Sequence, residues 1–162
     1  MERTMKKSIR KQWKVVLVCF MLVFVVGCGN SKENVSIDTS ALAEKLLETV
    51  KNDELTKIDS ELVESTYNIK ADQYEEGAVY VSSGATAMEI AIFKGKDKAS
   101  IEEISKAIDA RKKEQIEAYT TYAPEQVPKL EAAVKKEVGN YIIYCVTEDE
   151  KQAESIINDA VK

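Results

Sequence analysis

The feature that most constrains the fold is a run of six residues, Tyr141–Val146, in which every side chain is aliphatic, aromatic or a thiol. Gly139-Asn140 precedes the run, and a two-residue link of this type predicts a β-hairpin with strands over 132–138 and 141–147. Successive residues of a strand point to opposite faces, so the second strand is apolar on both faces. A strand with one face in water would alternate instead. We therefore expect both faces of the sheet to be covered, either by N-terminal helices or by a partner protein.

A second hairpin is predicted earlier in the chain, with strands over 78–82 and 87–94. Ser83-Gly84-Ala85 lies between them and is a turn signal. Alternation along the second of these strands assigns its residues to two faces. One face holds Met88, Ile90 and Ile92, and the other holds Ala87, Glu89, Ala91 and Phe93.

Helices are predicted before, between and after the two hairpins. Apolar periodicity indicates a helix over 38–51, a short helical piece over 55–63 and a final helix over 148–161. The central helix is the longest: a Ser100–Glu103 capping box marks its start, and it ends before Pro124. This order predicts one α+β domain over residues 38–162, with a largely antiparallel sheet of four strands.

The first 28 residues predict export and lipidation. Six basic residues are followed by a charge-free run of twelve, Val15–Val26, and a helix that crosses a bilayer needs about 20 apolar residues. Val25-Val26-Gly27-Cys28 resembles the lipobox of bacterial lipoproteins, whose cysteine receives a diacylglyceryl group. We expect residues 1–27 to be a signal peptide and 28–37 to be a flexible tether from lipidated Cys28. The alternative is an uncleaved anchor helix with a chance cysteine.

Charge and composition exclude several classes of function. The chain has 23 basic and 28 acidic residues, and removal of residues 1–27 leaves 17 and 27, a net charge near −10. This charge argues against binding to nucleic acid or anionic lipid. The chain has no histidine, and Cys145 is the only cysteine after Cys28. We therefore expect no histidine-based catalysis, no metal or cofactor site and no disulfide within the domain.

Two polar residues interrupt the apolar stripe of the central helix, Arg111 and Gln115. They are candidate ligand contacts, because the guanidinium fork of arginine suits carboxylates. The alternative is structural: Arg111 is tied to Glu89 or to a loop carbonyl, and Gln115 bonds adjacent backbone. We favour the structural alternative. The whole stripe, at spacings of three and four, is Ile101, Ile104, Ile108, Arg111, Gln115, Ala118 and Tyr122.

Tyrosines and acidic clusters are the remaining candidates. Tyr122, with Tyr119, Tyr141 and Tyr144, either lines a glycan-binding surface or belongs to the core with a wet hydroxyl, and we favour the core. Paired acids occur at 75–76, 102–103 and 148–150. Such pairs serve glycoside hydrolysis or calcium binding, but two of these clusters fall at predicted helix N-termini, where the helix dipole favours acids.

Several short motifs, taken in order, resemble a known family. They are the strand Ala87–Lys94, the helix with Arg111 and Gln115, the segment Tyr122–Gln126, and Gly139–Tyr141. Their order and spacing are similar to those of the bacterial lipoproteins grouped as domain of unknown function 4358, over roughly residues 41–162. The family occurs mainly in Gram-positive bacteria, and the resemblance implies a surface lipoprotein with no established enzymatic activity. It also implies a loose association with membrane-bound acyltransferases and their secreted partners, which acylate surface glycans.

These observations give one main hypothesis and two alternatives. The main hypothesis is a non-enzymatic domain, lipid-anchored on the extracytoplasmic side of the cell membrane, that binds a protein partner or a cell-envelope component as an accessory factor. The strand that is apolar on both faces and the acidic charge motivate the partner. The first alternative is a small-ligand or glycan-binding lipoprotein with Arg111, Gln115 and nearby tyrosines in a cleft. The second is a hydrolase with two facing carboxylates about 5–9 Å apart.

Overall fold

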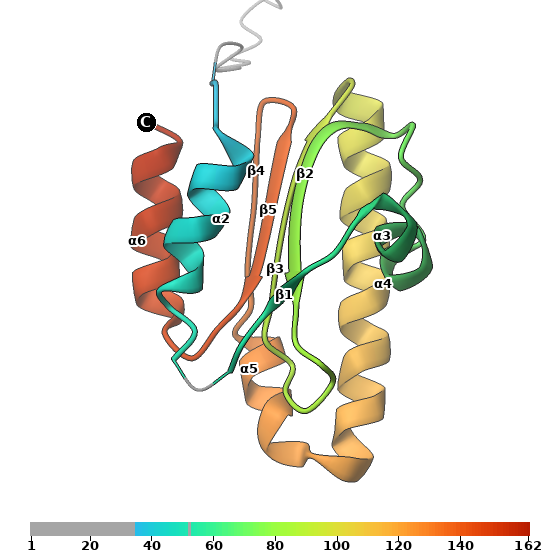
Figure 1. Cartoon of the computed structure of the whole chain (residues 1–162), viewed down its shortest axis with the longest axis vertical. Coiled ribbons are helices and arrows are strands. Elements are labelled where there is room, and N and C mark those ends of the chain that lie inside the picture. The colour runs from blue at the N-terminus through green and yellow to red at the C-terminus, as the bar shows by residue number, and fades with distance from the viewer. Residues whose placement is uncertain (1–34, 52) are drawn as a thin grey trace, which may run out of the picture. The chain divides into compact units, whose positions relative to one another are not determined.

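The computed structural model describes residues 35–51 and 53–162. The predicted signal peptide, the lipobox and most of the predicted tether lie outside the described residues. The elements (Figure 1), in chain order, are α2 Thr39–Leu47, β1 Thr56–Lys57, α3 Ser60–Tyr67, β2 Tyr74–Val81, β3 Glu89–Gly95, α4 Lys98–Tyr122, a 3-10 turn Pro124–Gln126, α5 Val127–Glu131, β4 Val134–Val138, β5 Tyr141–Val146 and α6 Glu150–Ala160.

The strands form one sheet in the order β1-β2-β3-β5-β4, and every pairing is antiparallel. Both predicted hairpins are present, β2–β3 and β4–β5, and β3 and β5 lie side by side in the middle. The predicted antiparallel sheet is confirmed, but the count of four strands was wrong.

The fifth strand is β1, which pairs with β2 through Thr56 and Lys57. Helical spacing had suggested a helix here, but the helix α3 begins only at Ser60, where the Asp59 carboxylate accepts the Leu62 N–H at 3.0 Å. Both β1 residues are exposed. Two exposed residues carry no alternation, so the sequence offered no strand pattern to detect.

Helices cover both faces of the sheet (Figure 1): α2 and α6 lie on one face, and α3 and α4 on the other. All six residues of β5 are buried. Ile142, Tyr144 and Val146 belong to the core cluster on the α4 side. Tyr141, Ile143 and Cys145 belong to the cluster that holds Leu42 and Leu46 of α2 and Ile157 of α6. The chain's own helices therefore cover both faces of β5. The apolar character of this strand gives no reason to expect a partner protein on either face.

The helix ends differ slightly from the predicted ones. Asp97, not Ser100, caps α4, and its Oδ1 accepts the Ser100 N–H at 2.8 Å. The helix ends at Tyr122, before Pro124, as predicted. Just before α2, Ile37 is 5 % exposed and packs in the core, so the packed part of the chain begins before this helix. Among the helices of the described part of the chain, none is both long and apolar enough to span a bilayer.

Replacing Ile143 with alanine tests this two-sided core. Ile143 is fully buried, and loss of its methylenes should lower the free energy of unfolding by about 2–5 kcal/mol. Leu62→Ala is the control, because Leu62 is 51 % exposed and its loss should change stability by less than about 0.5 kcal/mol. Urea denaturation followed by circular dichroism measures both. Similar small losses in the two variants would contradict a core closed by α2 and α6.

Candidate functional site

Glu89 is the one acidic or basic side chain buried within the described residues, at 1 % exposure. It lies at the start of β3 and faces α4. The side chains of Arg111 and Gln115 reach it from α4, and the Gln115 amide donates to Glu89 Oε2 at 3.2 Å. The two interruptions of the apolar stripe therefore lie opposite the one buried carboxylate.

Arg111 is held on several sides. Its Nε lies 2.9 Å and its Nη2 2.6 Å from Glu89 Oε2, and its Nη1 donates to the Thr66 carbonyl at 3.3 Å. The guanidinium also lies over the Tyr67 ring, 4.7 Å from its centroid. Burial lowers the pKa of Arg111, but the charge and hydrogen bonds of the Glu89 carboxylate raise it, and the net effect is a raised pKa. This geometry matches the structural alternative, in which Arg111 is tied to Glu89. Gln115 differs from the prediction, because its amide bonds Glu89 and not the adjacent backbone.

Three buried polar atoms around this ion pair have no protein partner among the described residues: the hydroxyls of Tyr67 and Tyr144 and Oε1 of Gln115. Burial, followed by the nearby Glu89 charge, raises the pKa of both tyrosines well above the ordinary value. Both phenols therefore stay neutral. The Glu89 carboxylate is buried and takes its hydrogen bonds from Arg111 and Gln115, which matches the structural alternative.

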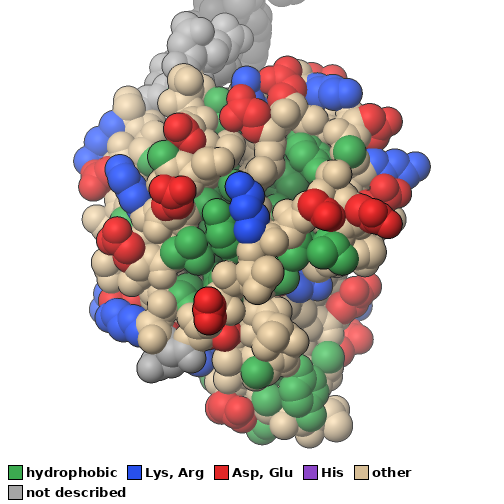
Figure 2. All heavy atoms as spheres, viewed as in Figure 1, with side chains coloured by type: hydrophobic (Ala, Val, Ile, Leu, Met, Phe, Trp, Pro, Cys, Tyr) green, Lys and Arg blue, Asp and Glu red, His purple; other side chains and the backbone are tan. Residues whose placement is uncertain are grey.

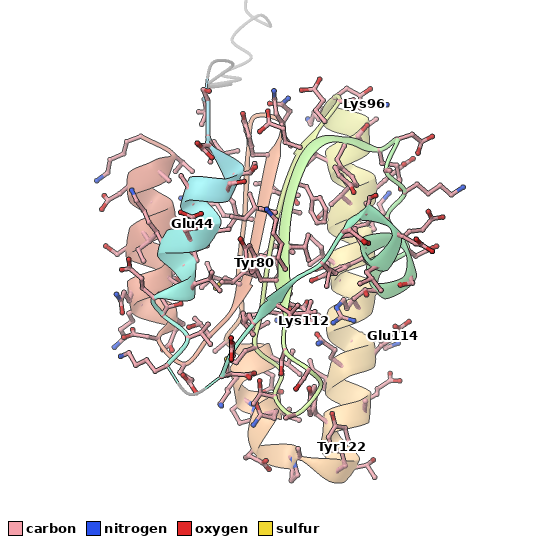
Figure 3. The ribbon with its side chains drawn as sticks, viewed as in Figure 1. Glu44, Tyr80, Lys96, Lys112, Glu114 and Tyr122 are labelled. Carbon is pink, nitrogen blue, oxygen red and sulfur yellow. The ribbon has the colours of Figure 1, made fainter. Side chains whose placement is uncertain are left out.

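Tyr122 lies apart from that cluster. Tyr122 lies eleven positions after Arg111 in α4, which is about 16 Å along a helix axis. Figure 3 shows Tyr122 at one end of α4, well away from Lys112. Tyr122 is 61 % exposed, its ring lies 4.9 Å from that of Tyr119, and its hydroxyl donates to the Gly84 carbonyl at 3.1 Å. The core assignment was wrong for Tyr122, whereas Tyr119, Tyr141 and Tyr144 are buried. The structure thus brings together Arg111 and Gln115, but not Tyr122.

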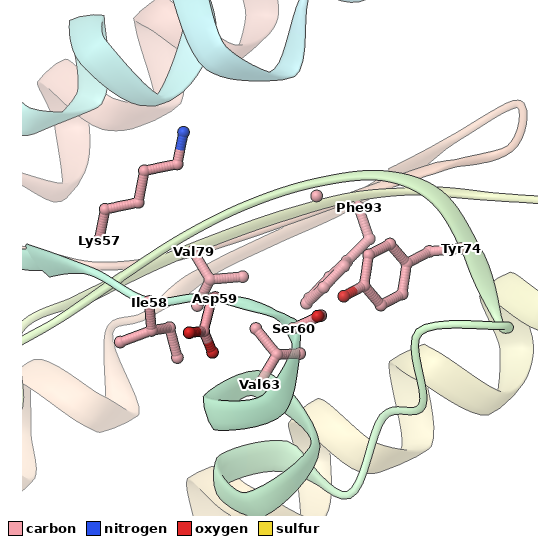
Figure 4. A pocket seen from close by; sticks show the side chains of 9 residues that line it. Lys57, Ile58, Asp59, Ser60, Val63, Tyr74, Val79 and Phe93 are labelled. Carbon is pink, nitrogen blue, oxygen red and sulfur yellow. The ribbon is translucent and has the colours of Figure 1, made fainter.

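An open pocket of about 280 Å³ lies elsewhere, between the start of α3 and the outer edge of β2 (Figure 4). Figure 4 shows the Ser60 and Tyr74 side chains pointing toward one another in it, while the Lys57 side chain points away. Figure 2 shows hydrophobic side chains reaching the surface on either side of β1. The pocket is lined by Lys57, Ile58, Asp59, Ser60, Val63, Tyr74, Gly77, Val79 and Phe93.

Gly77 keeps this pocket open. A Cβ built there would lie 3.1 Å from Cε2 of Tyr74 and 3.3 Å from Cδ1 of Phe93, so any other residue would crowd both rings. The rings themselves pack edge to face at 5.2 Å. Burial, followed by the Asp59 charge, raises the pKa of Tyr74, which keeps its hydroxyl a neutral donor and acceptor. A glycine inside a strand can mark a close approach of other groups to the backbone, and Gly77 could have indicated the pocket. It was missed because the predicted strand began at residue 78, one residue after Gly77.

The remaining candidates have structural roles. Glu75 and Glu76 pair with Lys94, at 2.8 and 3.4 Å. Glu148 accepts the Lys51 N–H at 2.9 Å. Burial raises the pKa of the Cys145 thiol to about 12, so it stays an unreactive thiol. Within residues 35–51 and 53–162, no group of three or more histidine, cysteine or acidic side chains is placed to hold a metal ion.

A family match covers residues 48–147, under the description domain of unknown function (DUF4358). The chain belongs to this family. No curated protein and no solved structure matches the chain. The expected membership is thereby confirmed, and the function of this DUF4358 domain has to be argued from its own residues.

Removal of one partner of the buried ion pair tests its structural role. Arg111→Met leaves the Glu89 carboxylate buried without its cation and should destabilise the domain by about 3–5 kcal/mol. The double variant Glu89→Leu, Arg111→Met removes both charges and should be more stable than Arg111→Met alone. Urea denaturation measures both. A double variant that is no more stable than Arg111→Met alone would contradict the ion-pair role.

Proposed function

We propose that this DUF4358 protein is a non-enzymatic binding domain, lipid-anchored through Cys28 on the extracytoplasmic side of the cell membrane. It acts as an accessory factor that holds a protein partner or a cell-envelope component. The observation that carries the binding role is the open pocket beside β2, which combines an apolar wall at Val79 and Phe93 with the hydroxyls of Ser60 and Tyr74. A few polar groups in an apolar hollow are typical of binding sites.

The arrangement of the acidic groups supports a non-enzymatic role. Glycoside hydrolysis needs two facing carboxylates in one cleft. Here the buried carboxylate, Glu89, is bound to Arg111, and the acids Glu75 and Glu76 pair with Lys94. In the pocket the acid is Asp59, and one of its oxygens already caps α3. Each of these acids thus has a structural partner.

The anchor fixes where such a domain would work. Cys28 would carry two acyl chains, and two chains hold a protein stably at a membrane. Seven residues lead from Cys28 to Val35, a reach of at most about 25 Å. The partner is therefore expected at or near the membrane surface, which suits an accessory to a membrane-bound, envelope-modifying enzyme.

A glycan is the second candidate, and Tyr122 is the observation that favours it. Its ring is exposed and lies beside that of Tyr119, and aromatic rings pack on sugar faces. This surface is distinct from the pocket, so the two candidates predict different contact residues.

Fatty-acid labelling tests the anchor. Cells that express the chain are fed an alkyne-tagged palmitate, and the purified protein is assayed for the tag. We expect labelling of the wild type and of Cys19→Ser, and none of Cys28→Ser. The intact mass should also show loss of residues 1–27. A full-length, unlabelled chain would instead support an uncleaved anchor helix.

Lysine crosslinking in intact cells, followed by mass spectrometry, tests the binding role. We expect a discrete crosslinked product whose contacts map to Lys57, the lysine at the pocket. Contacts near Tyr122 with wall polymer would favour the glycan candidate. Recovery of the uncrosslinked chain, or of the chain crosslinked only to other copies of itself, would contradict an accessory role.

A further inference from the structure

The outer edge of β2 is only partly paired. The strand runs from Tyr74 to Val81, but β1 pairs with it at Tyr80 and Val81, and Ile58 then donates to the Val79 carbonyl at 3.0 Å. Beyond that point the chain turns away into α3. Outward-facing backbone groups recur at every second residue of an antiparallel ladder. The N–H and C=O of Gly77 therefore point outward like those of Val79, with no strand of the described chain opposite them.

The pocket opens on the same stretch of edge. Gly77 lines the pocket, and the rings of Tyr74 and Phe93 already fill the direction in which a Cβ at Gly77 would point, so the two rings form one wall of the space that a neighbouring side chain could enter. Val63 and Val79 line the same space. An unpaired backbone edge thus lies beside a hollow that has room for an apolar side chain.

We propose that an extended peptide segment of a partner protein adds as an antiparallel strand to β2 beside Gly77 and places one apolar side chain in this pocket. The inference rests on the proposed binding function and names its site and the class of partner. In this mode the backbone hydrogen bonds supply affinity, and the pocket for an alternate side chain supplies specificity. The antiparallel sense follows every other pairing in the sheet.

The charge around the edge selects a basic segment. Residues 57–77 contain six acidic and two basic residues, and with Lys94, which pairs with Glu75 and Glu76, the net charge is −3. Figure 2 shows acidic side chains around the α3 side of this face. Complementary charge steers association and suppresses wrong partners. A second copy of the chain is a poor occupant, because its own β2 edge carries the same net negative charge.

The other edge of the sheet differs in a way that supports this choice. The edge strand β4 carries Lys135 and Lys136, and lysines on an edge strand are a common protection against strand addition. No side chain protrudes from β2 at Gly77, so an approaching backbone meets no obstacle there. The two edges of one sheet are thus protected unequally, and the open one adjoins the pocket.

Backbone methylation of a defined peptide tests strand addition. The probe is an eight-residue peptide of alternating lysine and threonine with one central leucine, titrated into the full-length chain in zwitterionic micelles. We expect the amide signals of Gly77 and Val79 to shift in NMR spectra and hydrogen exchange at Gly77 to slow. A leucine seated beside Gly77 turns its own N–H toward β2. N-methylation of the leucine should therefore weaken binding about tenfold or more, and N-methylation of the next residue should not.

Matched variants and peptides complete the test. Gly77→Val pushes against the Tyr74 and Phe93 rings that wall the pocket and should weaken binding by about tenfold, whereas Glu137→Val, which places the same side chain on β4, should leave binding unchanged. A peptide with glutamate in place of lysine should not bind. Equal binding of the two N-methylated peptides, or shifts confined to other surfaces, would overturn strand addition. If no peptide binds while crosslinking in cells still recovers a partner, strand addition is wrong and the proposed binding function stands.

Discussion

The pairing of β3 with β5 is the interaction on which the rest of the structure depends, because it joins two hairpins into one sheet. Ile92 lies opposite Ile143 and Ile90 opposite Cys145, and these residues are fully buried. An isolated two-stranded hairpin is marginal in water, and a sheet with a helical layer is not. Since β5 is apolar on both faces, the pairing also requires two helical layers. The positions of α2 and α6 on one face and α3 and α4 on the other follow from that requirement.

The same pairing places the buried carboxylate. Glu89 lies opposite Val146 at the end of the β3–β5 ladder and faces α4, where an unpaired charge would be costly. Arg111 removes that cost and bonds the Thr66 carbonyl of α3 as well. One side chain therefore links the sheet, α4 and α3. A buried ion pair is a weak source of stability compared with apolar packing, but it penalises any other rotation or register of α4. These contacts supply the partners that the two polar positions on the stripe require.

The elements with a strong local sequence pattern could be predicted, and those without such a pattern could not. Both hairpins and the long helix were predictable, because Tyr141–Val146 is an unbroken apolar run after a Gly-Asn turn and the stripe from Ile101 to Tyr122 recurs at helical spacing. The contact of Arg111 with Glu89 was foreseeable as an alternative, since a polar break in an apolar stripe must find a partner. The strand β1 was not, because its two exposed residues take their conformation from β2 and not from their own pattern. The pocket was missed for the same reason: it forms between segments whose contact depends on β1.

The shortness of β1 accounts for both the open edge and the pocket. Had the strand continued past Ile58, the next residues would have paired with Gly77 and closed the edge. Instead, the Asp59 carboxylate caps α3 and starts a helix, so the chain leaves the sheet at this point. Because the start of α3 diverges from β2, a hollow remains between them, and the glycine at position 77 lets the Tyr74 and Phe93 rings pack against the strand as its wall. An open edge is a hazard for self-association, and the acids of residues 57–77 counter that hazard by like-charge repulsion while leaving a basic segment free to approach. The features that terminate β1 are therefore the same ones that give the domain a selective edge.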